Sequence, residues 1–181
     1  MRTRPAFTLM EIMVVVAILV IVTAISIPLV RTMLDDGHLA AAGDMIRGQV
    51  AETRSRALES GRPWRLAYIA NTGFFQLAPE DASDWDNTAT DPVRKENLIR
   101  DQLPPDIVFA INRDDILGAQ QAGTPGQSWQ TIGIYTFDGG ARDDSTTYFG
   151  KPGLMPMRVR LRGLTGTVAV DSAADVKADQ P

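Results

Sequence analysis

The sequence contains no cysteine, a single histidine and no long run of lysine or arginine. The absence of cysteine excludes a disulfide framework, a thiolate metal site and a cysteine nucleophile, although a secreted domain of this size can fold without crosslinks. The histidine, His38, is most simply a solvated helix residue, because a metal site there would need partners that the chain supplies only as carboxylates. With a formal charge of -4, the chain is also less basic than a dedicated nucleic-acid binder.

The apolar residues of the chain are concentrated near its start. A length of 181 residues leaves room for one modest domain and an appendage. No residue between Ile12 and Val30 is charged, and only Thr23, Ser26 and Pro28 interrupt the apolar run. As a helix this run would be roughly 28 Å long, which is close to the thickness of a bilayer core. The run therefore predicts one membrane-spanning helix.

The charges on either side of the run predict its orientation. Arg2 and Arg4 precede it, whereas Arg31 is followed at once by Asp35 and Asp36. Positive charge favours the cytoplasmic side of a membrane. We therefore expect the amino terminus in the cytoplasm and the rest of the chain outside it.

Two ordinary kinds of segment share these features: a secretory signal peptide and a plain signal anchor. Residues 24–26, Ala-Ile-Ser, could imitate the cleavage site of a signal peptide, but the apolar run is long and continues beyond them. The sharper feature is Glu11, a carboxylate at the head of the membrane helix, where a generic anchor rarely has one. Alternatively, Glu11 lies at the membrane interface and favours the positive end of the helix dipole.

Residues 6–11, Ala-Phe-Thr-Leu-Met-Glu, with the basic leader before them and the apolar run after them, resemble the class III signal of type IV prepilins and type II secretion pseudopilins. The resemblance implies that a prepilin peptidase cuts between Ala6 and Phe7 on the cytoplasmic side. It also implies that the new amino group of Phe7 is then methylated. The family usually has glycine before the cut; this chain has alanine, the next smallest residue, which bears on the efficiency of processing.

The same resemblance gives roles to two further residues. Counted from Phe7, Glu11 is the fifth mature residue and Pro28 the twenty-second, positions at which similar proteins carry the same residues. An unpaired carboxylate in the apolar core of a filament would cost several kcal/mol. The resemblance implies that Glu11 pairs with the amino group of Phe7 in an adjacent subunit, which recruits that subunit and sets its axial register. Pro28 removes one helix hydrogen bond, so we expect it to kink or loosen the helix.

A stripe of mostly apolar residues predicts that the helix continues beyond the membrane. Its members recur at spacings of three and four and are Leu29, Met33, Leu39, Ala42, Met45, Ile46, Gln49, Val50, Thr53, Ala57 and Leu58. Ser60, Gly61 and Pro63 supply a helix stop. We therefore expect four segments: a cleaved leader (1–6), a transmembrane and filament-core helix (7–30), its amphipathic continuation (31–61) and a β-rich periplasmic domain (62–181).

After the helix the pattern changes to short strands. We expect strands at Trp64–Ile69, Phe74–Ala78, Ile107–Ile111, Thr131–Phe137, Met157–Leu161 and Thr167–Val170. The stretches 79–105 and 112–130 are polar and are expected to be surface loops, the first with a little structure around Val93–Ile99. The expected fold class is α+β, with a long amino-terminal helix packed on a carboxy-terminal antiparallel sheet.

A second resemblance indicates a place within the family. Residues 54–63 resemble the end of the first helix in GspH/FimT-type minor pseudopilins and pilins, and Tyr135–Gly140 and the hairpin with Gly163 and Gly166 are similar to the same group. The implied function is that of a structural subunit, a minor pseudopilin near the tip of a type II secretion pseudopilus, which helps to export folded proteins across the outer membrane. The close alternative is a minor pilin that initiates a surface type IV pilus.

The implied partners are other pilins or pseudopilins, the prepilin peptidase and the bacterial inner membrane. We expect no cofactor and no small-molecule substrate. Some FimT-like pilins bind DNA for uptake, and Arg54, Arg56, Arg62 and Arg65 could be invoked for that role. Acidic neighbours of these arginines make a nucleic-acid partner the weaker expectation.

The remaining candidate sites are acidic. Glu80, Asp81, Asp84, Asp86 and Asp91 form the densest cluster, and Asp81, Asp84 and Asp86 are candidates for calcium. The spacing does not match an EF-hand loop, so solvated loop carboxylates are the simpler interpretation. A membrane-anchored periplasmic enzyme is the alternative of another class. We do not expect one, because no nucleophile and base, and no carboxylate pair, stand out.

Overall fold

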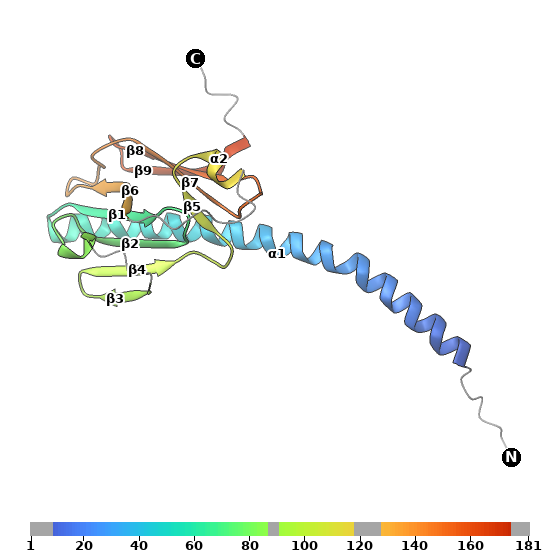
Figure 1. Ribbon diagram of the computed structural model, residues 1–181. Coiled ribbons are helices and arrows are strands. Elements are labelled where there is room, and N and C mark those ends of the chain that lie inside the picture. The colour runs from blue at the N-terminus through green and yellow to red at the C-terminus, as the bar shows by residue number, and fades with distance from the viewer. Residues whose placement is uncertain (1–8, 87–90, 118–127, 175–181) are drawn as a thin grey trace. The chain divides into compact units, whose positions relative to one another are not determined.

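The computed structural model describes residues 9–86, 91–117 and 128–174 (Figure 1). Its first element is the helix α1, which runs from Leu9 to Ser60. The chain forms two compact units that divide after Gly37, and each unit is described by itself.

Helix α1 ends where the sequence predicts. Gly61 has a φ of 65° and donates its N–H to the carbonyl of Ala57 at 3.1 Å, which satisfies one of the last helix carbonyls. Pro63 follows and cannot continue a helix. The indole of Trp64 then donates to the hydroxyl of Ser60 at 2.8 Å, so the first strand is tied to the helix end.

In the residues that the structure describes, nine strands follow the helix, with two short helical segments between them. The elements are β1 (Trp64–Ile69), β2 (Phe74–Pro79), η1 (Ser83–Asp86), β3 (Val93–Lys95), β4 (Leu98–Gln102), β5 (Val108–Ala110), α2 (Arg113–Leu117), β6 (Trp129–Tyr135), β7 (Ser145–Gly150), β8 (Met157–Arg162) and β9 (Thr167–Ser172). They form a five-stranded sheet in the order β3-β4-β2-β1-β6 and a four-stranded sheet in the order β5-β7-β8-β9. All the strand pairs in both sheets are antiparallel.

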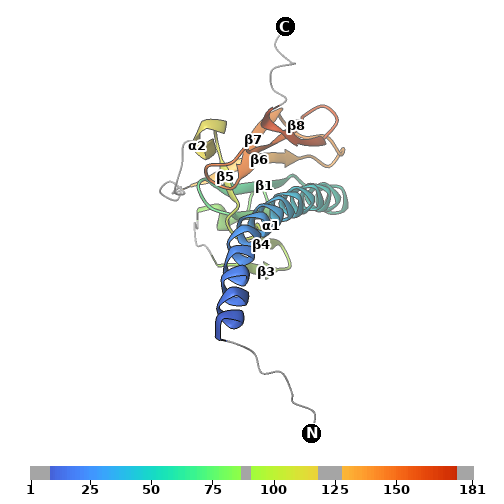
Figure 2. The same ribbon diagram turned by 90° about the vertical axis from the view of Figure 1, so that its right-hand side faces the viewer.

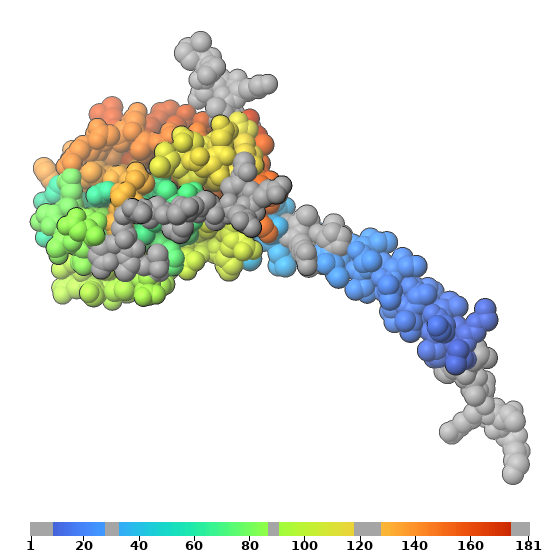
Figure 3. Space-filling model, in the orientation of Figure 1, coloured from blue at the N-terminus to red at the C-terminus, as the bar shows by residue number. Residues whose placement is uncertain are grey.

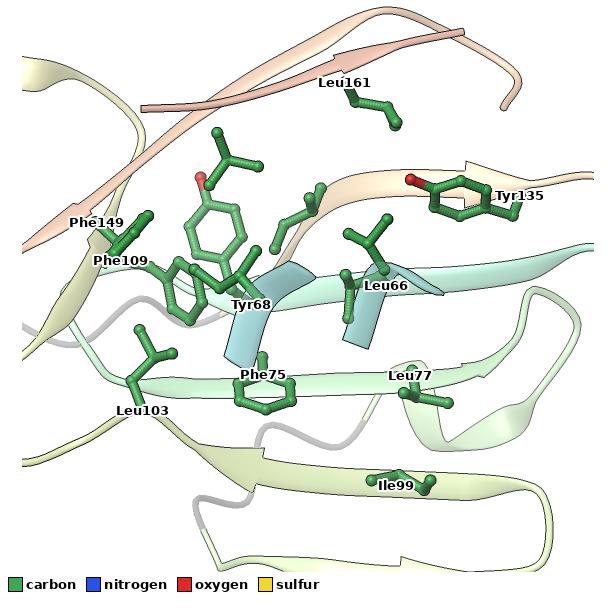
Figure 4. Close-up of a cluster of buried hydrophobic side chains, with 14 of the residues drawn as sticks. Leu66, Tyr68, Phe75, Leu77, Ile99, Leu103, Phe109, Tyr135, Phe149 and Leu161 are labelled. Carbon is green, nitrogen blue, oxygen red and sulfur yellow. The ribbon is translucent and has the colours of Figure 1, made fainter. Parts of the chain in front are cut away.

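The part of α1 after Gly37 packs on both sheets, and Figures 1 and 2 show it alongside strands of each. Its buried residues are spaced by three or four positions, so they form one face: Ala42, Ile46, Val50, Thr53 and Ala57. The apolar members of this face belong to the same core cluster as Leu66 and Leu77 of one sheet and Phe149 and Leu161 of the other (Figure 4). The predicted α+β class, with a helix on antiparallel strands, is confirmed, although there are two sheets instead of one.

Several elements differ from the sequence prediction. The stretch 79–105 is not a loop throughout, because it holds β3 and β4, and the stretch 112–130 includes α2 and the start of β6. Strand β7 was not predicted. The strand expected at Ile107–Ile111 is shorter, and β6 begins and ends two residues earlier than expected. In the stripe expected on α1, Met33 and Leu58 are exposed.

The Asp-Gly-Gly segment after β6 is a turn. The carboxylate of Asp138 accepts hydrogen bonds from the hydroxyl of Thr136 at 2.5 Å and from the N–H of Gly140 at 3.0 Å. These two bonds, the first above all, lower the pKa of Asp138. The turn leads to Arg142, whose guanidinium binds the carboxylate of Glu80 after β2 at 2.5 and 2.7 Å.

Candidate functional site

The start of α1 is long and apolar enough to cross a membrane. This candidate span runs from Leu9 to Ile27, and none of it is buried within the chain (blue in Figure 3). The large apolar side chains of the span are between 48% and 81% exposed. An apolar surface of this extent needs a lipid or protein environment to cover it. The span confirms a helix suited to a membrane, as the sequence predicts.

Glu11 is the charged residue of this span and lies in the first turn of α1. The other polar side chains are satisfied by the helix itself: Thr23 donates to the carbonyl of Leu19 at 2.7 Å, and Ser26 donates to that of Val22 at 2.8 Å. A carboxylate at this place can bind a cation or an amino group far more strongly than it could in water, because apolar surroundings screen charge weakly.

The other predicted residues of the amino-terminal site are only partly placed. Ala6 and Phe7 lie outside the described residues. Pro28 lies inside α1, which is helical on both sides of it. The predicted kink or loosening at Pro28 stays a prediction, as do the cleavage and methylation at Ala6 and Phe7 and the pairing of Glu11.

The four arginines near the end of α1 do not act as one basic patch. Arg56 binds Glu52 at 2.7 Å and stacks over Trp64, with its Cζ 5.2 Å from the ring centroid. Arg62 approaches Asp81 at 3.9 Å, and Arg65 stacks over a tryptophan at 4.5 Å. Arg54 alone of the four lies at a groove beside β9. This dispersal gives no support to a nucleic-acid surface built from these residues.

Sequence reasoning missed a cluster of arginines and tryptophans on the five-stranded sheet. Trp85 and Trp129 meet edge to face with centroids 6.2 Å apart, and Arg65 stacks on Trp85 while Arg100 stacks on Trp129. Arg100 is only 5% exposed and donates from Nε and Nη2 to the side-chain oxygen of Gln76 at 2.9 and 2.5 Å. Burial lowers the pKa of both arginines. Trp129 belongs to a second small hydrophobic core, and Trp85 packs against that core.

The acidic candidates for calcium lie at η1 and just before it. Asp84 and Asp86 belong to η1, and Asp81 precedes it with Arg62 nearby. Within the described part of the chain, no group of three or more aspartate, glutamate or histidine residues is placed to hold a metal ion. The three aspartates therefore gain no support as ligands, and they stay candidates only from the sequence. His38 lies on α1.

Two hollows of the described domain contain carboxylates. One of about 580 Å³ over β7 and β8 contains a single carboxylate, Asp144, which accepts the N–H of Gly163 at 2.5 Å. One of about 370 Å³ near η1 contains Asp81, Asp84 and Glu96, together with the cations Arg62 and Lys95. Neither arrangement offers a nucleophile held by a base.

Comparison with known proteins agrees with this geometry. The helix and sheets define a pilin-like α+β fold, and residues 1–27 match the family model described as the prokaryotic N-terminal methylation motif. The fold is similar to the solved structure of the minor pseudopilin EpsH from the Type 2 Secretion System of Vibrio cholerae, with a TM-score of 0.50 and 11% sequence identity. The similarity covers 76% of this chain and 99% of that chain. No curated protein sequence matches this chain.

Proposed function

We propose that this chain is a structural subunit of a type IV pilin-like filament, specifically a minor pseudopilin of a type II secretion pseudopilus. The observation that carries the proposal is Glu11 in the first turn of an apolar helix whose sequence matches an N-terminal methylation motif. The pilin-like fold supports the same assignment. In this proposal the β-rich unit lies in the periplasm and the span Leu9–Ile27 holds the chain in the inner membrane before assembly.

The chemistry of assembly follows from charge compensation. Cleavage between Ala6 and Phe7 creates a new amino group at the start of the apolar helix. When the apolar helices of several subunits pack together, Glu11 loses water and needs a cation. The methylated amino group of Phe7 in the next subunit is such a cation, and the ion pair defines one axial offset between subunits. A subunit of this kind performs no reaction of its own.

The proposal is tested by measuring the intact mass and the amino-terminal sequence of the membrane-extracted protein, expressed with and without a prepilin peptidase. We expect a start at N-methylated Phe7 that depends on the peptidase. An unprocessed Met1 in both cases would contradict the proposal and leave a plain anchored domain. A start near Ile27 would also contradict it, because it would indicate a secreted domain.

Glu11→Ala separates processing from assembly. We expect this variant to be cleaved and yet to enter filaments of co-expressed pilin subunits poorly. Asp36→Ala, which removes an exposed carboxylate farther along α1, is the matched control and should assemble normally. Equal incorporation of both variants would refute the role of Glu11.

The motif itself does not separate a secretion pseudopilus from a type IV pilus. A minor pilin that initiates a type IV pilus is therefore the second candidate, because it would need the same residues 1–27. Co-purification with the major subunit of one machine, when both machines are present in the same cell, decides between them.

A further inference from the structure

A groove of about 420 Å³ lies between α1 and the edge strand β9, inside the unit that follows Gly37. Its helix side includes Val50, Ala51 and Leu58, and its strand side consists of Gly166, Thr167 and Val168. Leu58 is 50% exposed although it belongs to the stripe that the sequence predicts to be buried. The groove therefore combines apolar surface with the edge of a sheet.

The edge of β9 presents unpaired backbone groups to this groove. β9 is the last strand of its sheet, and in the described chain its partner is β8 alone. The guanidinium of Arg47 donates to the carbonyl of Val170 at 3.2 Å, so this carbonyl points away from β8. In an antiparallel pair the N–H and C=O of one residue point to the same side, and the side alternates along the strand. Val168, two residues before Val170, therefore directs its N–H and C=O to the free edge.

The charge of the groove is positive. Its ionisable lining residues are Arg47 and Arg54, and no carboxylate lines it. Arg47 is partly neutralised by Asp44 at 2.8 Å. Arg54 forms no ion pair within the part of the chain that the structure describes. Its guanidinium lies beside the turn at Gly139, where an added Cβ would be 3.2 Å from Nη2. An acidic side chain is thus the one that this groove favours.

We propose that the groove receives an extended acidic segment of a neighbouring subunit, which adds to β9 as a further strand. The inference rests on the proposed function, because a filament subunit has neighbours with which such contacts are made. The backbone of the segment pairs with Val168, while its apolar side chains contact Leu58 and a carboxylate binds Arg54. Strand addition of this kind obtains affinity from main-chain hydrogen bonds and specificity from alternate side chains.

The test uses the full-length chain in detergent micelles and a blocked peptide, Thr-Val-Thr-Glu-Thr-Val-Thr, which places valine, glutamate and valine on one face of a strand. We expect the peptide to shift the NMR signal of the Val168 amide and to slow its hydrogen exchange. The twin peptide with lysine in place of glutamate should bind about fivefold more weakly, as expected for an exposed ion pair. A third peptide, N-methylated on alternate backbone amides, should lose binding because it cannot complete the ladder.

Charge reversal identifies the site. Arg54→Glu should reverse the preference, so that the lysine peptide binds more tightly than the glutamate peptide. Arg94→Glu makes the same change in charge on β3, another exposed edge strand, and should leave the preference unchanged.

Four results would overturn the inference. They are an unperturbed Val168 amide, equal binding of the glutamate and lysine peptides, retained binding of the N-methylated peptide, and equal effects of Arg54→Glu and Arg94→Glu. A helix bound in the groove would perturb Leu58 without protecting the Val168 amide, which also counts against strand addition. The peptide experiment needs neither cleavage nor assembly, so its failure is distinguishable from failure of the proposed function.

Discussion

Arg158 and Asp171 face each other across β8 and β9, and their side chains form a two-pronged ion pair. Nε and Nη2 of the arginine donate to the two carboxylate oxygens at 2.9 and 2.8 Å. This hydrogen bonding is the main reason that the pKa of Asp171 is lowered. The pair joins the edge strand that forms one wall of the α1/β9 groove to the rest of its sheet.

Asp171→Asn should lower the free energy of unfolding by about 1 kcal/mol at pH 7, since the pair is partly exposed. An unfolded aspartate has a pKa of about 3.9. Because the folded pKa is lower, the contribution is present above that value and is lost as the pH falls through the folded pKa. Denaturant unfolding of the β-rich unit in the full-length protein, measured between pH 7 and pH 2, should show the two proteins converging in acid.

The control for this prediction is Asp86→Asn, which removes the charge of an exposed aspartate in η1. It should unfold like the wild type at every pH. A difference between wild type and Asp171→Asn that persists unchanged at pH 2 would show that the ion pair is not the cause.

The apolar helix and its end could be predicted from the sequence because their signals are local. The charge at Glu11, the uncharged run after it and the glycine and proline after Ser60 depend only on neighbouring residues. Strand β1 was predicted with its observed bounds, and β2 within one residue, because their apolar and aromatic residues and the turn between them are also local signals.

The missed elements depend on contacts between distant segments. Strand β4 contains Arg100 and Asp101 and therefore looks like a loop, but Gln76 and Trp129 accommodate the buried guanidinium. Strand β7 is rich in threonine, and its burial depends on the core around Phe149. The α1/β9 groove brings together residues more than a hundred positions apart, so no local pattern in the sequence could predict it.

Tyr135→Phe should stabilise the protein by about 1 kcal/mol, because it removes a buried hydroxyl that has no hydrogen-bond partner in the described chain. Burial raises the pKa of Tyr135, while the charge of Arg54 opposes the shift. An unfolded tyrosine ionises near pH 10, whereas the folded Tyr135 stays neutral at that pH, so the wild type loses stability as the pH rises from about 10 toward the folded pKa. Tyr135→Phe should therefore also resist alkaline unfolding better than the wild type.

Tyr68→Phe is the comparison, because the hydroxyl of Tyr68 is hydrogen-bonded to Thr147. This substitution should cost about 1 kcal/mol at pH 7. Thermal or denaturant unfolding of both variants measures the difference, and equal effects of the two substitutions would contradict the assignment of the Tyr135 hydroxyl as unsatisfied.

Gly166→Ala should destabilise the β8–β9 hairpin strongly. Gly166 has a φ of 61°, and a Cβ there would lie 2.6 Å from the backbone oxygen of Gly139. Gly61 has a similar φ of 65°, but a Cβ at Gly61 would meet nothing within 4 Å. Gly61→Ala should therefore cost only the backbone strain of about 1–2 kcal/mol. In denaturant unfolding we expect Gly166→Ala to lower the free energy of unfolding by about 2 kcal/mol more than Gly61→Ala does. Equal losses for the two variants would refute the steric argument.

Ala6→Gly should speed the proposed cleavage before Phe7, because the related signals usually carry glycine at this place. A peptidase pocket shaped for glycine would accept the methyl group of alanine only at a steric cost. Ala6→Val enlarges the same side chain and should slow cleavage or abolish it. The measurement is the fraction of chain that starts at Phe7 after a pulse of expression with the peptidase, followed by mass spectrometry over time. If glycine, alanine and valine give the same rate, the peptidase does not read this position, and the alanine in this chain has no effect on its maturation.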